Sequence, residues 1–132
     1  MENTLNGILI VQDDLQKIVN FSEKCLKAGI DESGIYATVY ATDIYRLLST
    51  KNISTIIIDS EFYNLSTAAT LAKFSAEKGL QVLLVTSNRF KKTIRMIMDR
   101  NLRYINPNIS YKDLGIILKP TINSAIQKVV HL

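Results

Sequence analysis

The stretch that decides the fold is Ile8-Leu9-Ile10-Val11-Gln12-Asp13-Asp14, where four apolar residues run directly into an amide and two acids. A short, continuous, β-branched run of this kind is typical of a strand buried on both faces of a parallel sheet. Apolar residues at three- and four-residue spacings follow and predict an amphipathic helix that stops at Gly29. The residues that make this pattern are Leu15, Ile18, Val19, Phe21, Ser22, Cys25 and Leu26, which predicts an apolar side of the helix that faces inward.

The same strand–helix unit recurs four more times along the chain. Further strands are predicted over residues 35–41, 53–58, 80–85 and 102–105. Thr42 and Ser66 are predicted to cap the second and third helices, a fourth helix covers residues 88–101, and Ser110 and Asp113 form a capping-box-like start for the fifth. Five units in strict alternation predict an α/β fold: a doubly wound, five-stranded parallel sheet with helices on both faces.

Residues 1–132 are predicted to form a single domain, because no linker, repeat or low-complexity segment interrupts the pattern. Pro120 should end or kink the fifth helix, so that residues 120–132 are either a kinked continuation or an extra helix. The apolar stripe of this tail could also support a homodimer.

Composition excludes several classes of protein. The chain is 47% hydrophobic and 21% charged, which is ordinary for a globular domain and wrong for disorder. Its apolar runs are too short to span a membrane, and residues 1–4 have no basic stretch typical of a secretory signal, so a cytoplasmic location is expected. The single cysteine, Cys25, excludes an internal disulfide and a cysteine-based zinc site, and its place on the apolar side of a helix predicts a core position.

The positive charge is concentrated in residues 89–113. This segment has seven basic and two acidic residues, a net charge of +5, whereas the whole chain carries +4. Three interpretations stay open: a solvated helix face, a docking surface for an acidic partner, and a nucleic-acid interface across Arg89–Arg103. Nucleic acid is the least favoured, because no helix-turn-helix segment accompanies the charges and few aromatic residues are interleaved with them.

Polar residues follow the predicted strands at the edge where open parallel sheets bind ligands. They are Gln12, Asp13 and Asp14 after the first strand, Asp59 after the third, Thr86 after the fourth and Asn106 after the fifth. Carboxylates gathered in this way could hold Mg²⁺, and a carboxylate beside the metal could accept a phosphoryl group. The alternative is structural, because an acid after a strand often caps the next helix or loop.

Four of these strand ends, taken in order, resemble the receiver domain of bacterial two-component signalling and phosphorelay proteins. The matching segments are Ile8–Asp13, Ile56–Asp59, Leu83–Thr86 and Tyr104–Pro107, and the resemblance extends through about Leu118. It implies a flavodoxin-like (βα)₅ fold.

The resemblance also implies roles for the strand-end residues. Asp59 would be the phosphoacceptor, with Thr86 beside the phosphoryl group. Mg²⁺ would be held by Asp13 and Asp59, with Gln12 in place of the first acid and Asp14 as a further candidate. A register shifted by one residue would instead make Asp13 and Asp14 the acid pair. The fourth helix, fifth strand and fifth helix would contact partners, through Arg89, Lys91, Lys92, Arg95, Arg103 and Tyr104.

Two departures from the receiver pattern weaken the predicted chemistry. Gln12 contributes no charge to a metal, and Asn106 stands where the family has a lysine that pairs with the phosphoryl group. The bond before Pro107 is usually cis in the family, and the sequence leaves it open.

The favoured hypothesis is therefore a pseudo-receiver. It would not be an enzyme, would bind Mg²⁺ weakly or not at all, and would act by contact with another signalling protein, either a histidine kinase or a downstream effector. The alternative is a working single-domain response regulator phosphorylated on Asp59, with at most receiver-type autophosphorylation and dephosphorylation. A flavin- or nucleotide-binding protein is disfavoured, because no glycine-rich loop follows the first strand.

Overall fold

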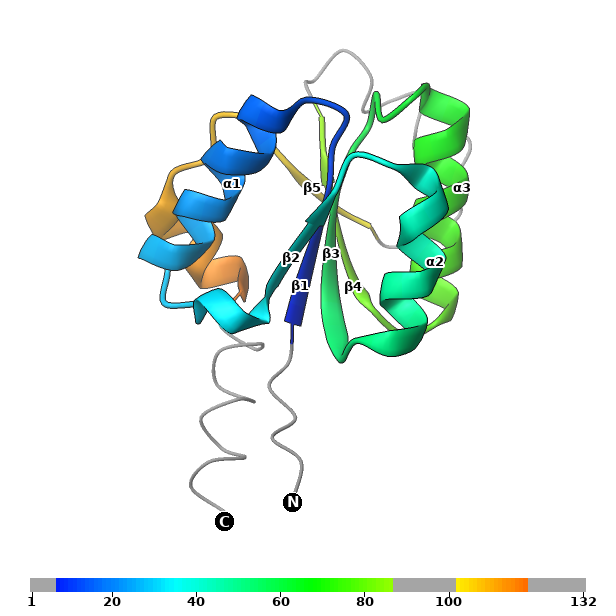
Figure 1. Cartoon of the computed structure of the whole chain (residues 1–132). Helices are drawn as coiled ribbons and strands as arrows, with labels where there is room; N and C mark the ends of the chain where they lie inside the picture. Colours follow the sequence, from blue (N-terminus) through cyan, green and yellow to red (C-terminus); the bar gives the residue numbers. More distant parts are fainter. Residues whose placement is uncertain (1–6, 87–101, 119–132) are drawn as a thin grey trace, which may run out of the picture.

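The computed structural model describes residues 7–86 and 102–118, which form one parallel five-stranded sheet with the strand order β2-β1-β3-β4-β5 (Figure 1). Its strands are β1 (Gly7–Val11), β2 (Ile35–Thr38), β3 (Ile53–Asp59), β4 (Gln81–Val85) and β5 (Arg103–Ile105). Every pairing is parallel. The predicted doubly wound, flavodoxin-like fold is confirmed. The predicted helix over residues 88–101 and the tail 120–132 lie outside the described residues.

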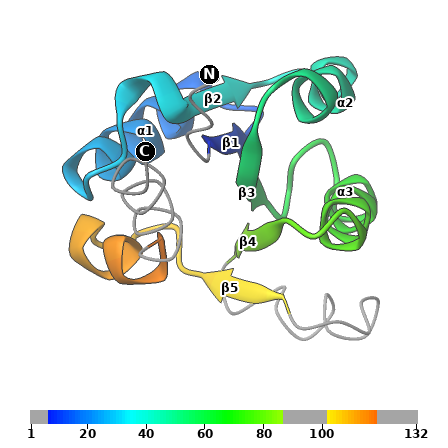
Figure 2. The same ribbon diagram turned by 90° about the horizontal axis from the view of Figure 1, so that it is seen from below.

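Helices cover both faces of the sheet (Figure 2). Helix α1 (Leu15–Lys27) and the helical segment 111–118 lie on one face, and α2 (Ala41–Thr50) and α3 (Leu65–Glu77) lie on the other. A 3₁₀ turn, η1 (Glu32–Gly34), leads into β2. Within the described ranges, no helix is long and apolar enough to cross a membrane.

The sheet separates two hydrophobic cores because successive residues of a strand point to opposite faces. Ile8 and Ile10 pack with Phe21, Cys25 and Leu114 under α1 and segment 111–118. Leu9 and Val11 instead pack toward α2 and α3, with Ile44, Phe62, Leu71 and others. Each fully buried Ile or Leu contributes about 1.5–3 kcal/mol. Burial on both faces therefore explains why the predicted strands are continuous apolar runs.

Helix α1 buries fewer of its apolar residues than the sequence predicts. Phe21 and Cys25 are buried as expected. Leu15, Val19 and Leu26 were predicted to face inward, but their exposed fractions are 70%, 47% and 44%. The helix carries apolar residues around more than one side, and only the side that meets β1 and segment 111–118 is covered.

Four predicted boundaries are wrong, and for the first three the reason is that a nearer polar side chain ends or starts the element. The second strand ends at Thr38, not residue 41, because the Thr38 hydroxyl accepts from the Tyr40 N–H at 3.0 Å and turns the chain. Helix α2 consequently begins before Thr42. Helix α3 is capped by Asn64, whose side chain accepts from the Thr67 N–H at 2.8 Å, and not by Ser66. The fourth strand begins at Gln81.

The loop between β3 and α3 is tied to the start of α2. The N-cap residue of α2, Tyr40, makes no side-chain capping bond. Instead the Ala41 N–H donates to the Tyr63 hydroxyl at 3.2 Å. Tyr63 has a φ of 60°, a conformation that a bulky residue rarely adopts, and its ring stacks on Phe62 with the ring centres 4.5 Å apart.

Burial of Cys25 makes the stability of the domain sensitive to alkali. Burial raises the pKa of the Cys25 thiol from 9.0 to about 12. The folded state therefore holds this proton more tightly than the unfolded state, and the resulting stabilisation is present below pH 9 and lost as the pH rises toward 12. We expect the free energy of unfolding, measured by urea titration, to fall more steeply above pH 9 in the wild type than in Cys25→Ala. Parallel pH profiles for the two proteins would contradict this.

Candidate functional site

The candidate site lies at the carboxyl ends of β1, β3 and β4. Gln12, Asp59 and Thr86 follow or end these strands and are buried there, with exposed fractions of 3%, 7% and 6%. The strand order reverses direction between β1 and β3, and open α/β sheets bind ligands beside such a reversal. The fold therefore brings three of the predicted site residues to the expected place.

Gln12 and Asp59 form a direct hydrogen bond between β1 and β3. The Gln12 amide Nε2 donates to Asp59 Oδ2 at 2.7 Å, and both side chains are buried. The second carboxylate oxygen, Asp59 Oδ1, accepts from the Glu61 N–H at 2.8 Å. Both oxygens of the predicted phosphoacceptor are thus engaged by protein N–H groups. Hydrogen bonds to an ionised carboxylate are about twice as strong as neutral ones, so the arrangement holds the Asp59 side chain firmly.

The orientation of the Gln12 amide is fixed by its neighbours. Its oxygen, Oε1, accepts from the Asp13 N–H at 3.0 Å, and a backbone N–H can only donate. The nitrogen must therefore face Asp59. The amide presents N–H hydrogens to the carboxylate, on the side where a metal-binding acid would present an oxygen.

The acids after β1 are placed away from this pair. Asp13 and Asp14 are both exposed, and Asp14 caps α1 by accepting from the Gln16 N–H at 2.9 Å. Of the three polar residues after β1, Gln12 is the one whose side chain donates to Asp59. Within residues 7–86 and 102–118, no three His, Cys, Asp or Glu side chains gather as metal ligands would. With the Gln12 nitrogen against Asp59 Oδ2, these residues do not fit the Mg²⁺ that receiver chemistry requires.

Thr86 lies at the site, whereas Asn106 is used elsewhere. Thr86 is buried, and its backbone N–H donates to the Ile105 carbonyl at 3.0 Å. Asn106 is exposed and closes a turn, because its side-chain oxygen accepts from the Asn108 N–H at 2.8 Å. The Asn106–Pro107 peptide is trans, as are the other peptide bonds of the described ranges. The position of the family lysine therefore supplies no cation to Asp59.

Only part of the predicted docking surface falls within the described residues. Arg103 is exposed on β5, the edge strand, and Tyr104 is partly buried against the α2–α3 core. Arg89, Lys91, Lys92 and Arg95 lie outside the described residues.

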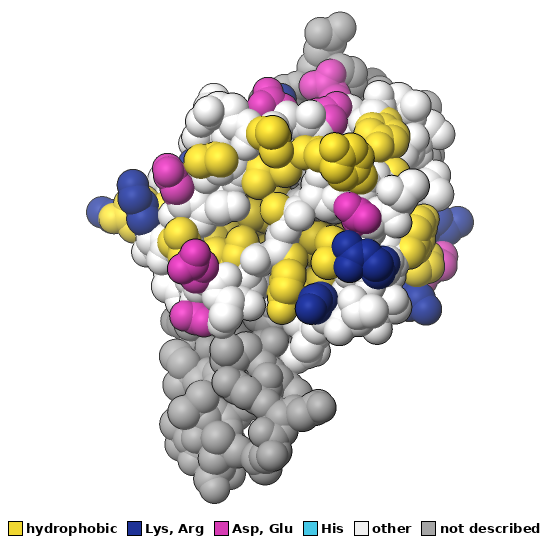
Figure 3. All heavy atoms as spheres, viewed as in Figure 1, with side chains coloured by type: hydrophobic (Ala, Val, Ile, Leu, Met, Phe, Trp, Pro, Cys, Tyr) yellow, Lys and Arg dark blue, Asp and Glu magenta, His cyan; other side chains and the backbone are white. Residues whose placement is uncertain are grey.

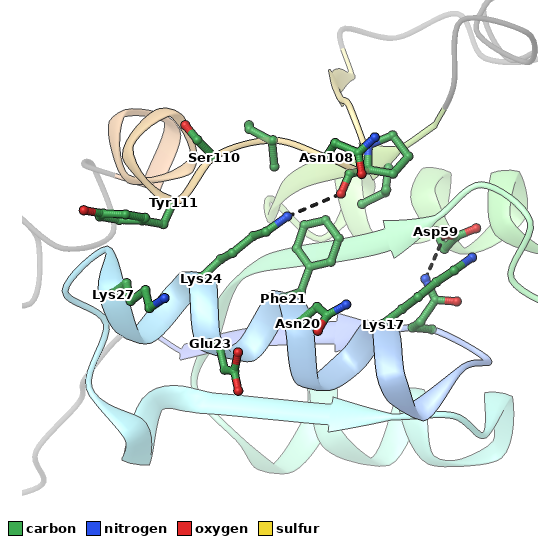
Figure 4. Close-up of a pocket in the computed structure, with 14 residues that line it drawn as sticks. Lys17, Asn20, Phe21, Glu23, Lys24, Lys27, Asp59, Asn108, Ser110 and Tyr111 are labelled. Atoms are coloured by element: carbon green, nitrogen blue, oxygen red, sulfur yellow. Dashed lines mark hydrogen bonds between the residues drawn. The ribbon is translucent and has the colours of Figure 1, made fainter.

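A pocket of about 610 Å³ opens beside Asp59, between α1 and residues 107–111 (Figure 4). Gln12, Asp59 and Val85 line it from the strand ends. The sequence analysis missed its other polar lining, which is Lys17, Asn20, Glu23, Lys24 and Lys27 from α1 and Asn108, Ser110 and Tyr111 from the opposite wall. Lysines at intervals of seven and three residues along one predicted helix were the available signal.

Charge is distributed unevenly around the carboxyl edge of the sheet. Asp13, Asp14 and Glu61 are exposed in the loops there, and acidic side chains gather along the top of the face shown in Figure 3. Asp13 and Asp14 lie at the N-terminus of α1, with Lys17 in its first turn, whereas Lys24 and Lys27 lie in its last turn. An anion would be repelled from the first region and attracted to the second.

No family model matches the chain, and no curated protein matches its sequence. Solved structures do match its fold. A response-regulator receiver-domain protein from Clostridium thermocellum has a TM-score of 0.72 at 18% identity, over 96% of this chain and 99% of that one. A protein provisionally assigned to pilus assembly, from Burkholderia pseudomallei, has a TM-score of 0.71 at 20% identity, over 93% of both chains. The N-terminal receiver domain of a Bacteroides fragilis response regulator has a TM-score of 0.70 at 16% identity, over 92% of this chain and 96% of that one. At these identities the likeness shows the fold.

Proposed function

We propose that this chain, which has the fold of response-regulator receiver domains, is a cytoplasmic pseudo-receiver: a signalling module that binds another protein without being phosphorylated. The observation that carries the proposal is the buried bond of 2.7 Å from Gln12 Nε2 to Asp59 Oδ2. It occupies, with a neutral hydrogen-bond donor from within the protein, the carboxylate oxygen that a metal ion would otherwise bind.

The surrounding residues support the same conclusion. A phosphoryl group on Asp59 would need Oδ2 to leave the Gln12 amide, and the amide nitrogen would then lose its partner in a buried place. Among residues 7–86 and 102–118, the transferred negative charge would meet no cluster of three metal-ligand side chains, and position 106 supplies no lysine. Removing one preorganised charge-stabilising group costs a reaction of this kind about 10²–10³-fold in rate. Loss of both the metal site and the lysine should therefore leave a very slow transfer of a phosphoryl group to Asp59.

The test is incubation with acetyl phosphate and Mg²⁺, followed by intact-mass measurement, with Asp59→Ala as the matched control. We expect no mass increase in either protein, because the wild-type carboxylate is already bonded on both oxygens. Circular dichroism would verify that both proteins are folded. A one-phosphoryl increment in the wild type alone would instead support the second candidate, a working response regulator phosphorylated on Asp59.

The partner of this module is proposed to be a histidine kinase or a downstream effector. Arg103 offers an exposed guanidinium on the edge strand, with Tyr104 next to it in the chain. Arginine and tyrosine are enriched among the residues that dominate protein interfaces. A homodimer through the apolar stripe of residues 120–132 is a separate proposal.

A further inference from the structure

The pocket beside Asp59 has no role in the pseudo-receiver proposal. Its volume of about 610 Å³ falls inside the range of about 300–1,000 Å³ typical of small-molecule sites. Two segments that are far apart in the sequence, α1 and residues 107–111, form its walls. Apolar groups of Phe21, Val85 and Ile109 contribute to the lining, together with the amides of Asn20 and Asn108.

The two ends of the pocket differ in charge. Figure 4 shows Lys17 and Asp59 at one end and Lys27 and Tyr111 at the other. At the first end the ammonium group offsets the carboxylate, so that this end carries little net charge. The Lys24 side chain extends from α1 across the pocket, with its ammonium beside Pro107 and Asn108, and Lys27 lies at the second end. The Glu23 side chain points away from Asn108 and Ser110. The second end is therefore the cationic one.

The cationic end also holds free hydrogen-bond donors. The Lys24 ammonium reaches across the pocket to the Pro107 carbonyl at 3.4 Å, which is a long contact that uses one of its three hydrogens. The Lys27 ammonium lies 6.0 Å from the centre of the Tyr111 ring. The Ser110 oxygen accepts from the Asp113 N–H at 3.1 Å, and its own hydrogen can still donate. Within the described ranges, neither lysine has an ion-pair partner.

Lysines in the last turn of a helix complement its dipole, which alone would account for Lys24 and Lys27. The dipole does not account for the position of these two lysines in the lining of a cavity whose opposite wall carries the Ser110 hydroxyl and the Asn108 amide and which has an apolar side. Such a combination suits a ligand that has one compact anionic group and an uncharged organic body.

We propose that this pocket binds a small organic phosphate. Its phosphate would lie between Lys24, Lys27 and Ser110, and its organic body would extend along Phe21 and Val85 toward Gln12 and Asp59. The anion would thus avoid the acidic N-terminus of α1, where nucleotide-binding folds usually place it. This inference goes beyond the pseudo-receiver proposal and does not depend on whether Asp59 can be phosphorylated.

The experiment is a titration of ¹⁵N-labelled protein, without Mg²⁺ or a phosphodonor, with adenosine 5′-monophosphate, adenosine, glucose 6-phosphate and inorganic phosphate as separate probes. We expect at least one of the two organic phosphates to shift the amide signals of Asn20, Asn108 and Ser110, with an affinity in the micromolar to low-millimolar range. The organic phosphate that binds more tightly, adenosine 5′-monophosphate or glucose 6-phosphate, identifies the class of organic body that the pocket accepts. The proposal is overturned if neither organic phosphate binds, if adenosine binds as tightly as its phosphate, or if inorganic phosphate alone binds equally well.

Three lysine variants locate the anion. Lys24→Met with Lys27→Met keeps much of the apolar stems and removes both charges, and it should weaken binding at least tenfold, since charge-assisted bonds to phosphate are the strong ones. Lys17→Met, at the other end of the pocket, should change the affinity by less. Lys73→Met, at an exposed position of α3 outside the pocket, is the matched control and should have no effect. Equal affinity in the wild type and the folded double variant would overturn the placement of the phosphate.

Discussion

A Gln12→Asp, Asn106→Lys double variant should gain Mg²⁺-dependent phosphorylation on Asp59, which the pseudo-receiver proposal does not expect of the wild type. The first change replaces the amide nitrogen at Asp59 Oδ2 with a carboxylate that can share a metal ion, and the second restores a cation for the transferred phosphoryl group. In the expected step, an Asp59 oxygen forms a bond to phosphorus while the bond from phosphorus to acetate breaks. We expect the rate of modification by acetyl phosphate, followed by intact mass, to rise by at least about a hundredfold.

The single variants and a triple variant are the controls for this gain. Each single change restores only one of the two charge-stabilising groups, so each should give a much smaller increase than the pair. Adding Asp59→Asn to the double variant removes the nucleophile at nearly constant shape and should abolish the modification. Removing Mg²⁺ with a chelator should do the same. A folded double variant that stays unmodified would show that something besides these two positions blocks the site.

Phe62→Ala should produce the largest loss of stability among substitutions in the loop after β3. The Phe62 side chain is fully buried in the core shared with α2 and α3, although the residue lies in a loop. Its backbone N–H also donates to the Asp59 carbonyl at 3.0 Å. The buried ring and this backbone bond together hold the loop that carries the site. Truncating a buried phenylalanine costs about 3–5 kcal/mol, and we expect a loss of that size in the free energy of unfolding from urea titration.

Tyr40→Ala is the matched control, because Tyr40 is an aromatic residue at the same end of the sheet with 61% of its surface exposed. Substitutions at exposed positions usually change the free energy of unfolding by less than about 0.5 kcal/mol. Similar losses in the two variants would mean that the loop is not anchored through the Phe62 ring.

The order and type of the described elements could be predicted from the sequence because each buried strand is a short continuous apolar run. A segment such as Ile56–Ile58, which is buried on both faces of the sheet, is apolar at every position, and this pattern predicts a strand. The helix starts could not be predicted as well, since Asn64 and Ser66 are both good capping residues and local preference does not choose between them. The exposed side of α1 was missed for a similar reason: apolar residues lie on several of its sides, and only the packed structure decides which one is covered.

The candidate site was predictable in its position and not in its contacts. Strand ends converge in any parallel sheet of this order, so Gln12, Asp59 and Thr86 could be grouped in advance. That the Gln12 nitrogen faces Asp59 depends on the Asp13 N–H, a backbone group with no signature in the sequence. The pocket lysines were missed because the opposite wall, residues 107–111, is more than eighty residues away from them along the chain.

The Tyr63 hydroxyl joins the loop after β3 to the start of α2 through a hydrogen bond. It accepts the Ala41 N–H, one of the backbone groups that the first turn of a helix leaves without an internal partner. Any displacement of the loop after β3 therefore releases this hydrogen at the same moment, and loss of a cap costs a helix about 1 kcal/mol. Movement of the loop after β3 is therefore expected to weaken the start of α2, since the two share this hydrogen bond.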